Sequence, residues 1–297
     1  MAKKTPVISI SSGKLQGIYQ DKEKIAVFKG IPYAQPPVDD LRWRPPQPVK
    51  SWSGVKEATK FSPMAFQLMA EFEKFIGNLL SGQGWSRLRT MLVGQIFKLL
   101  PLPKQSEDCL YLNVRTPNLD ANAKLPVMVW IHGGDHHDGS GSDVFYDSNA
   151  LAHHDVVVVS INYRLGLMGY FAHPDLSAES ENNVSGNYGT LDQIAALQWI
   201  QENVSAFGGD PNNVTIFGES AGGESVIHMM SSPLARGLFQ KAISQSPANA
   251  GQMIHLKTPF LDFDSAENIG RRFAETIGAT GDNQVEQLRA MSPEKLY

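Results

Sequence analysis

The stretch Val214-Thr215-Ile216-Phe217-Gly218-Glu219-Ser220-Ala221-Gly222 decides the fold class. Its first four residues are an apolar run with β-branched side chains, which predicts a buried strand. A turn with glycine on both sides of Ser220 follows, and residues 224–229 then have the character of a helix. A serine at the apex of such a strand–turn–helix holds its hydroxyl exposed above the sheet. We therefore predict that Ser220 is a nucleophile and that the turn around it is formed by Gly218, Glu219 and Gly222.

The other apolar runs place this motif in an α/β sheet. Short strands are predicted at 7–10, 15–19, 25–28, 110–114, 127–131, 156–161 and 241–244. Helical spacing of apolar residues predicts helices at 191–207, 266–277 and 284–291. Strands that are apolar at every position are typical of parallel sheets buried on both faces. The sequence therefore predicts an α/β fold with a mostly parallel central sheet and helices on both faces.

A different pattern occupies residues 61–103. Apolar side chains such as Phe66, Met69, Phe72 and Ile76 recur every three or four residues, which is the period of a helix with one buried stripe. This stripe either packs into the core or belongs to a mobile apolar cap over a substrate pocket. We expect one domain over residues 1–297, with a helical, cap-like insertion at about 61–103.

A second glycine-rich turn supports the first motif. Residues 126–131 are predicted to form a strand, and His132-Gly133-Gly134 follows directly. In folds with a nucleophilic serine on a strand–turn–helix, such a loop supplies backbone amides to a negatively charged oxygen. The candidates for such amides are this loop and, at the start of the helix after Ser220, Ala221.

Taken together, these motifs resemble those of type-B carboxylesterases, the family of the cholinesterases and bacterial p-nitrobenzyl esterases. Residues 207–213 leading into 218–222 match the serine signature of that family, and residues 107–114 match its second signature. Further landmarks lie at 28–34, 162–164 and 186–189, so the resemblance covers nearly the whole chain. It implies an α/β-hydrolase fold and hydrolysis of small apolar esters through an acyl-enzyme on Ser220. It also implies that the backbone amides of Gly134, Asp135 and Ala221 bind the oxyanion, that no cofactor is needed, and that Glu107 and Asp108 have structural roles.

One departure from the family concerns the catalytic triad of serine, acid and histidine. In the family, the acid and the histidine lie far downstream of the serine in the sequence. Only 77 residues follow Ser220 here (297 − 220), and they contain no matching His-Gly motif. His255 comes too early, and His228 lies two helical turns past the serine and should point away from it. We therefore expect an N-terminal portion, truncated before the acid and the histidine. The alternatives we expect are a fragment, a truncated reading frame, or one half of a split enzyme completed by a C-terminal segment. A non-catalytic cholinesterase-like binding module and an inactive truncated fragment are the rival functions.

The loop after His132 departs from the family as well. Asp135 stands where the family has glycine or another small residue, and His136 stands where it has an aromatic residue. A carboxylate beside a developing oxyanion must turn away, be protonated, or serve a different reaction. The histidines and acids at 132–138 do not match a known zinc spacing, so we predict no metal site.

Composition and charge limit the classes of binding partner and the cellular locations that we expect. The net charge is −4, with 19% charged and 42% hydrophobic residues, and no basic stripe indicates nucleic-acid binding. No apolar segment is long enough to span a bilayer, and the residues after Met1 do not resemble a signal peptide. Cys109 is the only cysteine, so an intrachain disulfide is excluded and a buried free thiol is expected. These features predict a cytoplasmic protein that binds a small-molecule ester, with neither nucleic acid nor membrane as a partner.

Overall fold

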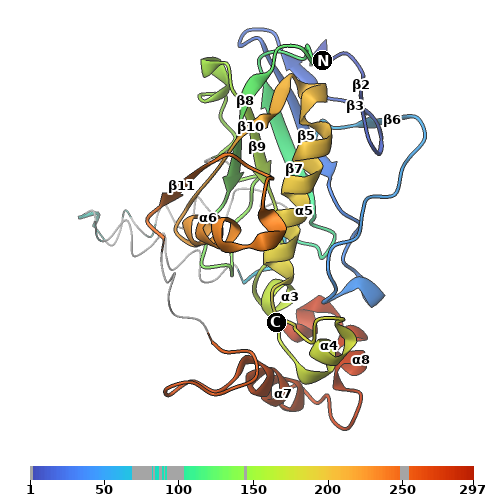
Figure 1. Cartoon of the computed structure of the whole chain (residues 1–297), viewed down its shortest axis with the longest axis vertical. Helices are drawn as coiled ribbons and strands as arrows, with labels where there is room; N and C mark the ends of the chain where they lie inside the picture. Colours follow the sequence, from blue (N-terminus) through green and yellow to red (C-terminus); the bar gives the residue numbers. More distant parts are fainter. Residues whose placement is uncertain are drawn as a thin grey trace.

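A large mixed sheet forms the centre of the computed structural model, which describes residues 3–68, 82, 84–86, 89, 91, 104–143, 146–247 and 254–297 (Figure 1). The strand order of this sheet is β1-β4-β5-β7-β9-β8-β10-β11. Its strands are β1 (Lys3–Lys4), β4 (Ile18–Gln20), β5 (Ile25–Pro32), β7 (Tyr111–Thr116), β9 (Val157–Ile161), β8 (Leu125–Ile131), β10 (Gly209–Glu219) and β11 (Lys241–Gln245). A smaller sheet contains β2 (Ile8–Ile10), β3 (Gly13–Gln16) and β6 (Val55–Glu57).

The half of the large sheet that carries the serine motif is parallel. Strands β9, β8, β10 and β11 all run in the same direction. The pairs β1–β4, β4–β5, β5–β7 and β7–β9 are antiparallel. Val129 of β8 lies opposite Val159 of β9 and Ile216 of β10, and all three side chains are fully buried. Because parallel strands end at the same edge of a sheet, the loops after β8 and β10 lie next to each other.

Helices α5 and α6 cover one face of this sheet. The α-helices of the described residues are α3 (Gly166–Tyr170), α4 (Pro174–Glu179), α5 (Tyr188–Asn203), α6 (Ala221–Ser231), α7 (Ala266–Thr276), α8 (Gln284–Arg289) and α9 (Pro293–Leu296). Short 3-10 helices occur at Asp39–Leu41, Ala152–His154, Val204–Phe207 and Pro233–Ala235. Leu197 and Ile200 of α5 and Val226 of α6 share one buried cluster with the strand residues Val129 and Ile216. The predicted α/β class, a central sheet packed against helices, is present, but the sheet is mixed and not mostly parallel, because only β9, β8, β10 and β11 pair in parallel.

Two predicted elements differ from the structure. The strand predicted at 15–19 is two strands, because the chain leaves β3 in the small sheet at Gly17 and enters β4 in the large one. A side chain at position 17 would collide with the carbonyl oxygen of Val27, so glycine permits this close crossing. The helical pattern predicted from Phe61 is wrong up to Leu68, where the chain has no helix. Most of the predicted cap-like insertion lies outside the described residues.

Arg42 joins helix α8 to the segment before β7 through one buried ion pair and backbone hydrogen bonds. The guanidinium of Arg42 forms two hydrogen bonds of 2.6 Å with the carboxylate of Glu107, and both side chains are almost fully buried. Arg42 also donates to the carbonyl oxygens of Leu288 and Met291 at the end of α8. The predicted structural role of Glu107 is therefore confirmed. Cys109 is a buried free thiol, as predicted, and burial raises its pKa.

Candidate active site

Ser220 occupies a strained turn between β10 and α6. Its backbone angles are φ 56° and ψ −124°, a region that residues with a side chain rarely adopt. Two hydrogen bonds hold the turn: the amide of Ser220 donates to the carbonyl oxygen of Gln245, and the amide of Glu224 donates to that of Ser220, both at 2.9 Å. Such strain costs about 1–3 kcal/mol and persists only where the surroundings enforce it. The predicted strand–turn–helix around Ser220 is present in the structure.

The glycines on either side of Ser220 are sterically required. A Cβ atom at Gly218 would lie 2.5 Å from the carbonyl oxygen of Gly222 and 2.7 Å from that of Ile131. A Cβ atom at Gly222 would collide with the same Ile131 oxygen. Both approaches are too close for any side chain, so the turn can pack against the end of β8 only with glycine at these positions.

The loop of residues 132–139, called here the glycine loop, lies directly beside Ser220. A Cβ atom at Gly133 would lie 3.2 Å from the Cβ atom of Ser220. Gly134, Asp135 and His136 have φ angles of 104°, 53° and 56°, so the loop turns sharply after Gly134. Asp135 is exposed to solvent. The structure thus brings together Ser220, Ala221 and the glycine loop, the segments that the sequence singled out.

Hydrogen bonds within the glycine loop and contacts to other elements hold it in this conformation. The amides of His137 and Asp138 both donate to the carbonyl oxygen of Gly134, at 2.8 and 2.9 Å. The amide of Gly166 donates to the carbonyl oxygen of His136 at 2.7 Å. The ring of His132 stacks on Tyr163 with centroids 4.4 Å apart, and burial lowers the pKa of His132 to about 4.

The side chain of His136 links the glycine loop to the helices behind Ser220. Its Nε2 atom lies 3.0 Å from the Oγ atom of Ser225 on α6. The amide nitrogen of Gln193 on α5 donates to the same Oγ atom at 2.9 Å. Burial lowers the pKa of His136, an effect that the nearby carboxylate of Glu224 opposes. Nothing in the sequence patterns indicated Ser225 or Gln193, because both belong to helices that were assigned from their apolar residues.

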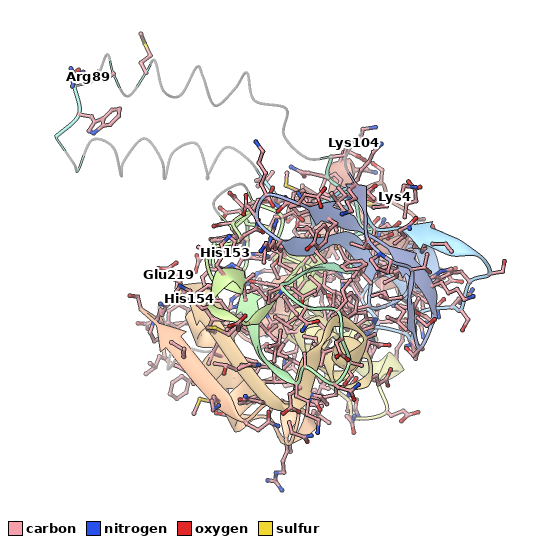
Figure 2. All side chains as sticks on the ribbon, turned by 90° about the horizontal axis from the view of Figure 1, so that it is seen from above. Lys4, Arg89, Lys104, His153, His154 and Glu219 are labelled. Atoms are coloured by element: carbon pink, nitrogen blue, oxygen red, sulfur yellow. The ribbon has the colours of Figure 1, made fainter. Side chains whose placement is uncertain are left out.

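Three further residues considered from the sequence are Glu219, His228 and His255. Glu219 is exposed at the surface (Figure 2). Nε2 of His228 lies 3.8 Å from the carboxylate of Glu224, and His255 stacks on Phe260. Among the residues that the structure describes, no histidine forms a hydrogen bond with the Ser220 hydroxyl.

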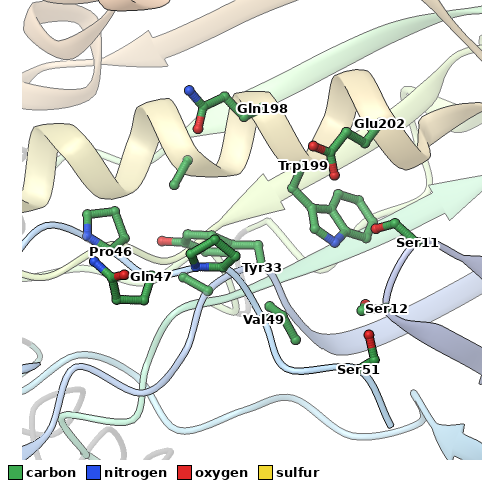
Figure 3. Close-up of a pocket in the computed structure, with 13 residues that line it drawn as sticks. Ser11, Ser12, Tyr33, Pro46, Gln47, Val49, Ser51, Gln198, Trp199 and Glu202 are labelled. Carbon is green, nitrogen blue, oxygen red and sulfur yellow. The ribbon is translucent and has the colours of Figure 1, made fainter.

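A separate cavity of about 210 Å³ lies between α5 and residues 46–51 (Figure 3). Trp199, Tyr33 and Ser12 are among its lining residues, and none of residues 132–139 or 218–222 is. This cavity is therefore distinct from the surroundings of Ser220.

In the described part of the chain, no three His, Cys, Asp or Glu side chains are arranged to hold a metal ion. None of the described helices is long and apolar enough to cross a membrane.

Comparison with known proteins adds independent information. The fumonisin B1 esterase of Sphingopyxis macrogoltabida is 45% identical over 285 residues, which are 96% of this chain and 46% of that protein. Liver carboxylesterase 1 of Oryctolagus cuniculus is 47% identical over 247 residues, covering 81% of this chain and 40% of that protein.

Solved structures agree with these relatives. A carboxylesterase of Geobacillus stearothermophilus superposes with a TM-score of 0.78 at 38% identity, over 98% of this chain and 53% of that one. A thermophilic p-nitrobenzyl esterase gives a TM-score of 0.79 at 37% identity, over 98% of this chain and 52% of that one. The chain thus spans about half the length of the proteins it matches. A family model described as the carboxylesterase family matches residues 4–297. The chain belongs to the carboxylesterase family.

Proposed function

We propose that this chain carries the nucleophile of an ester hydrolase and that Ser220 is that nucleophile. The observation that carries the proposal is the strained conformation of Ser220 between β10 and α6, because a serine nucleophile in this fold is held in such a turn at the carboxyl ends of the parallel strands. The Oγ atom forms a bond to the ester carbonyl carbon, and the alcohol then leaves with a proton. Water hydrolyses the resulting acyl-enzyme, releases the acid and restores the serine hydroxyl.

The oxyanion of each tetrahedral intermediate is proposed to bind the backbone amides of Gly134, Asp135 and Ala221. The first two belong to the glycine loop, which lies against the Ser220 turn, and Ala221 is the first residue of α6. Amides at a helix start and in such a loop are oriented before the reaction begins, so they stabilise the developing charge without reorganisation. Removing one donor of this kind typically lowers kcat by about 10²–10³-fold.

The general base and its acid partner are proposed to come from polypeptide equivalent to the second half of the relatives. Among the described residues no histidine forms a hydrogen bond with the Ser220 hydroxyl, and the matched relatives are about twice as long as this chain. The proposed substrates are small, largely apolar esters, in line with the carboxylesterase relatives. A cytoplasmic location likewise remains a proposal, which cell fractionation would test.

A fluorophosphonate probe tests the nucleophile. We would combine this chain with the second half of the thermophilic p-nitrobenzyl esterase, either fused or as a separate polypeptide, and follow labelling by mass spectrometry. Ser220 should be labelled, Ser220→Ala should not, and both labelling and hydrolysis of p-nitrophenyl acetate should be weak or absent for this chain alone. Equal labelling of wild type and Ser220→Ala would exclude Ser220. A completed protein that folds but is never labelled would favour a non-catalytic binding module.

A further inference from the structure

The cavity between α5 and residues 46–51 is lined by two buried polar groups that have no hydrogen-bond partner among the described residues (Figure 3). These groups are the indole N–H of Trp199 and the hydroxyl of Ser12. Trp199 is 5% exposed and Ser12 is 7% exposed. Buried polar groups in folded proteins are nearly always hydrogen-bonded, so each exception needs an explanation. Two exceptions around one cavity indicate a site for a polar ligand.

Hydrogen bonds hold the two walls of this cavity in place. The amide of Ser11 donates to Oδ1 of Asn203 at 2.7 Å, and Nδ2 of Asn203 donates to the carbonyl oxygen of Trp199 at 2.9 Å. The amide of Trp52 donates to the carbonyl oxygen of Ser12 at 3.0 Å. Asn203 thus ties the turn between β2 and β3 to helix α5. The two unpartnered groups are therefore held in fixed positions relative to each other.

The floor of the cavity is aromatic and its rim is polar. Tyr33 is buried in the floor, and its hydroxyl donates to the carbonyl oxygen of Asn162 at 2.6 Å. Its ring, rather than its hydroxyl, is therefore the part that a ligand contacts. The exposed polar residues of the lining include Gln47, Ser51, Gln198 and Glu202. Figure 3 shows Glu202 beside Trp199 on α5, so a carboxylate lies near the unpartnered indole.

The donors and acceptors of this lining select a class of ligand. An indole N–H only donates, so the ligand must present an acceptor to Trp199, whereas the Ser12 hydroxyl both donates and accepts. Among the described residues that line the cavity, Glu202 is the one with a charged side chain, and it disfavours phosphates and carboxylates. An ammonium ion pairs with Glu202 but cannot accept the N–H of Trp199. Several hydroxyl groups on one neutral molecule satisfy all three residues.

The size of the cavity limits the ligand further. Its volume of about 210 Å³ lies below the range of about 300–1,000 Å³ typical of sites for drug-sized molecules. We propose that this cavity binds a neutral polyol of the size of a monosaccharide. One hydroxyl of the ligand accepts from the indole of Trp199 and bonds to Ser12, and another donates to Glu202. A carbon face of the ligand packs on the ring of Tyr33.

This site goes beyond the proposed function and does not depend on it. None of residues 132–139 or 218–222 lines the cavity, so binding of a polyol requires neither Ser220 nor the glycine loop. Failure of Ser220 to react with a fluorophosphonate would refute the nucleophile and leave this site unaffected.

A matched pair of cyclic compounds tests the class of ligand on this chain. Every ring carbon of myo-inositol carries a hydroxyl, whereas cyclohexanol has the same ring with a single hydroxyl. In an NMR titration, myo-inositol or D-glucose should bind with a Kd below about 10 mM, and cyclohexanol should bind at least about tenfold more weakly. The indole N–H resonance of Trp199, identified by its loss in Trp199→Phe, should shift on binding.

Two substitutions test the residues. Trp199→Phe removes the donor but keeps an aromatic ring, and Ser12→Ala removes a hydroxyl that has no partner among the described residues, so the Ala variant should fold as wild type does. Each should raise the Kd of the polyol at least about fivefold. Trp130→Phe is the matched control, because the indole N–H of Trp130 is also unpartnered among these residues but lies in a different cavity. Its Kd should stay within about twofold of wild type.

Three results would overturn the proposal. The first is a Kd above about 10 mM for both polyols. The second is equal binding of the polyol by wild type, Ser12→Ala and Trp199→Phe, which would place the ligand elsewhere. The third is tighter binding of cyclohexanol or of inositol monophosphate than of myo-inositol, which would make the cavity a site for an apolar molecule or for an anion.

Discussion

Nε2 of His136 and Oγ of Ser225 lie 3.0 Å apart, although 89 residues separate them in the sequence. This contact joins the glycine loop to α6, the helix that begins directly after Ser220. Gln193 reaches the same hydroxyl from α5, so three elements meet at one buried oxygen atom. The position of the loop relative to Ser220 therefore depends on a polar contact as well as on backbone geometry.

Removing this hydroxyl should destabilise the chain. Ser225 is 1% exposed, and Ser225→Ala would deprive both His136 and the Gln193 amide nitrogen of a partner. A buried polar group left without a hydrogen bond costs about 1–3 kcal/mol, so the free energy of unfolding in urea should fall by that amount. Ser231→Ala is the control, since Ser231 is exposed on the same helix and bonds only to a backbone carbonyl. Its effect should stay within about 0.5 kcal/mol, and equal effects of the two variants would refute the role of the contact.

Acid should destabilise the chain through His132. Burial lowers the pKa of folded His132 to about 4, whereas an unfolded histidine titrates near its ordinary value of about 6.5. Between about pH 6.5 and about pH 4 the imidazole of His132 is protonated in the unfolded state but not in the folded state. The contribution of neutral, buried His132 to the free energy of unfolding is therefore complete above about pH 6.5 and is lost as the pH falls toward about 4. Over that window the loss is at most about 3 kcal/mol. Urea unfolding at several pH values measures it.

Replacing His132 separates its share of the pH dependence of unfolding from the share of the carboxylates, which also titrate in acid. His132→Phe keeps a ring stacked on Tyr163 but cannot bind a proton. Its free energy of unfolding should therefore depend less steeply on pH between 6.5 and 4 than that of wild type, whatever its absolute stability. Identical slopes for the two proteins would show that His132 is not the buried, neutral histidine of the structure.

Asp135 should have only a small electrostatic effect on catalysis in the completed enzyme. Its side chain is exposed, so solvent screens its repulsion of an oxyanion, and exposed charges typically contribute about 0–1 kcal/mol. Asp135→Asn removes the charge and keeps a residue that tolerates a positive φ angle. Asp135→Gly removes the charge and also the steric cost of the φ angle of 53° at this position. We expect turnover of p-nitrophenyl acetate to rise by less than about fivefold in both variants. A rise above about tenfold in Asp135→Asn would show that the carboxylate lies closer to the oxyanion.

Local patterns account for the parts of the fold that the sequence predicted. Residues 127–131 and 214–217 were predictable as strands because both are short runs of apolar, mainly β-branched residues. Every second side chain in them is fully buried, and those between are only partly buried. The turn around Ser220 was predictable because its glycines lie within two residues of it. By contrast, β10 begins at Gly209, and its polar start, Gly209-Asp210-Pro211-Asn212-Asn213, gave no strand signal.

Features that depend on distant residues could not be predicted. The change of sheet at Gly17 follows from a close approach to Val27, which the alternation of residues 15–19 does not reveal. The meeting of His136, Ser225 and Gln193 depends on the packing of a loop on two helices. The exposure of β11 follows from which strands pair beside it, because its sequence, Lys241-Ala242-Ile243-Ser244-Gln245, resembles that of a half-buried strand.

The strain at Ser220 gives a prediction that needs no enzymatic activity. Its φ and ψ of 56° and −124° are readily adopted by glycine, so Ser220→Gly should relieve a cost of about 1–3 kcal/mol. Glycine also loses more backbone entropy on folding, about 0.5–1 kcal/mol, so the net stabilisation in urea unfolding should be about 1 kcal/mol. Ser220→Ala is the matched control, because it removes the hydroxyl but keeps the Cβ atom and hence the strain. It should leave the stability within about 0.5 kcal/mol of wild type. If Ser220→Gly were no more stable than Ser220→Ala, the turn would be unstrained, and the conformation that presents the proposed nucleophile would need another explanation.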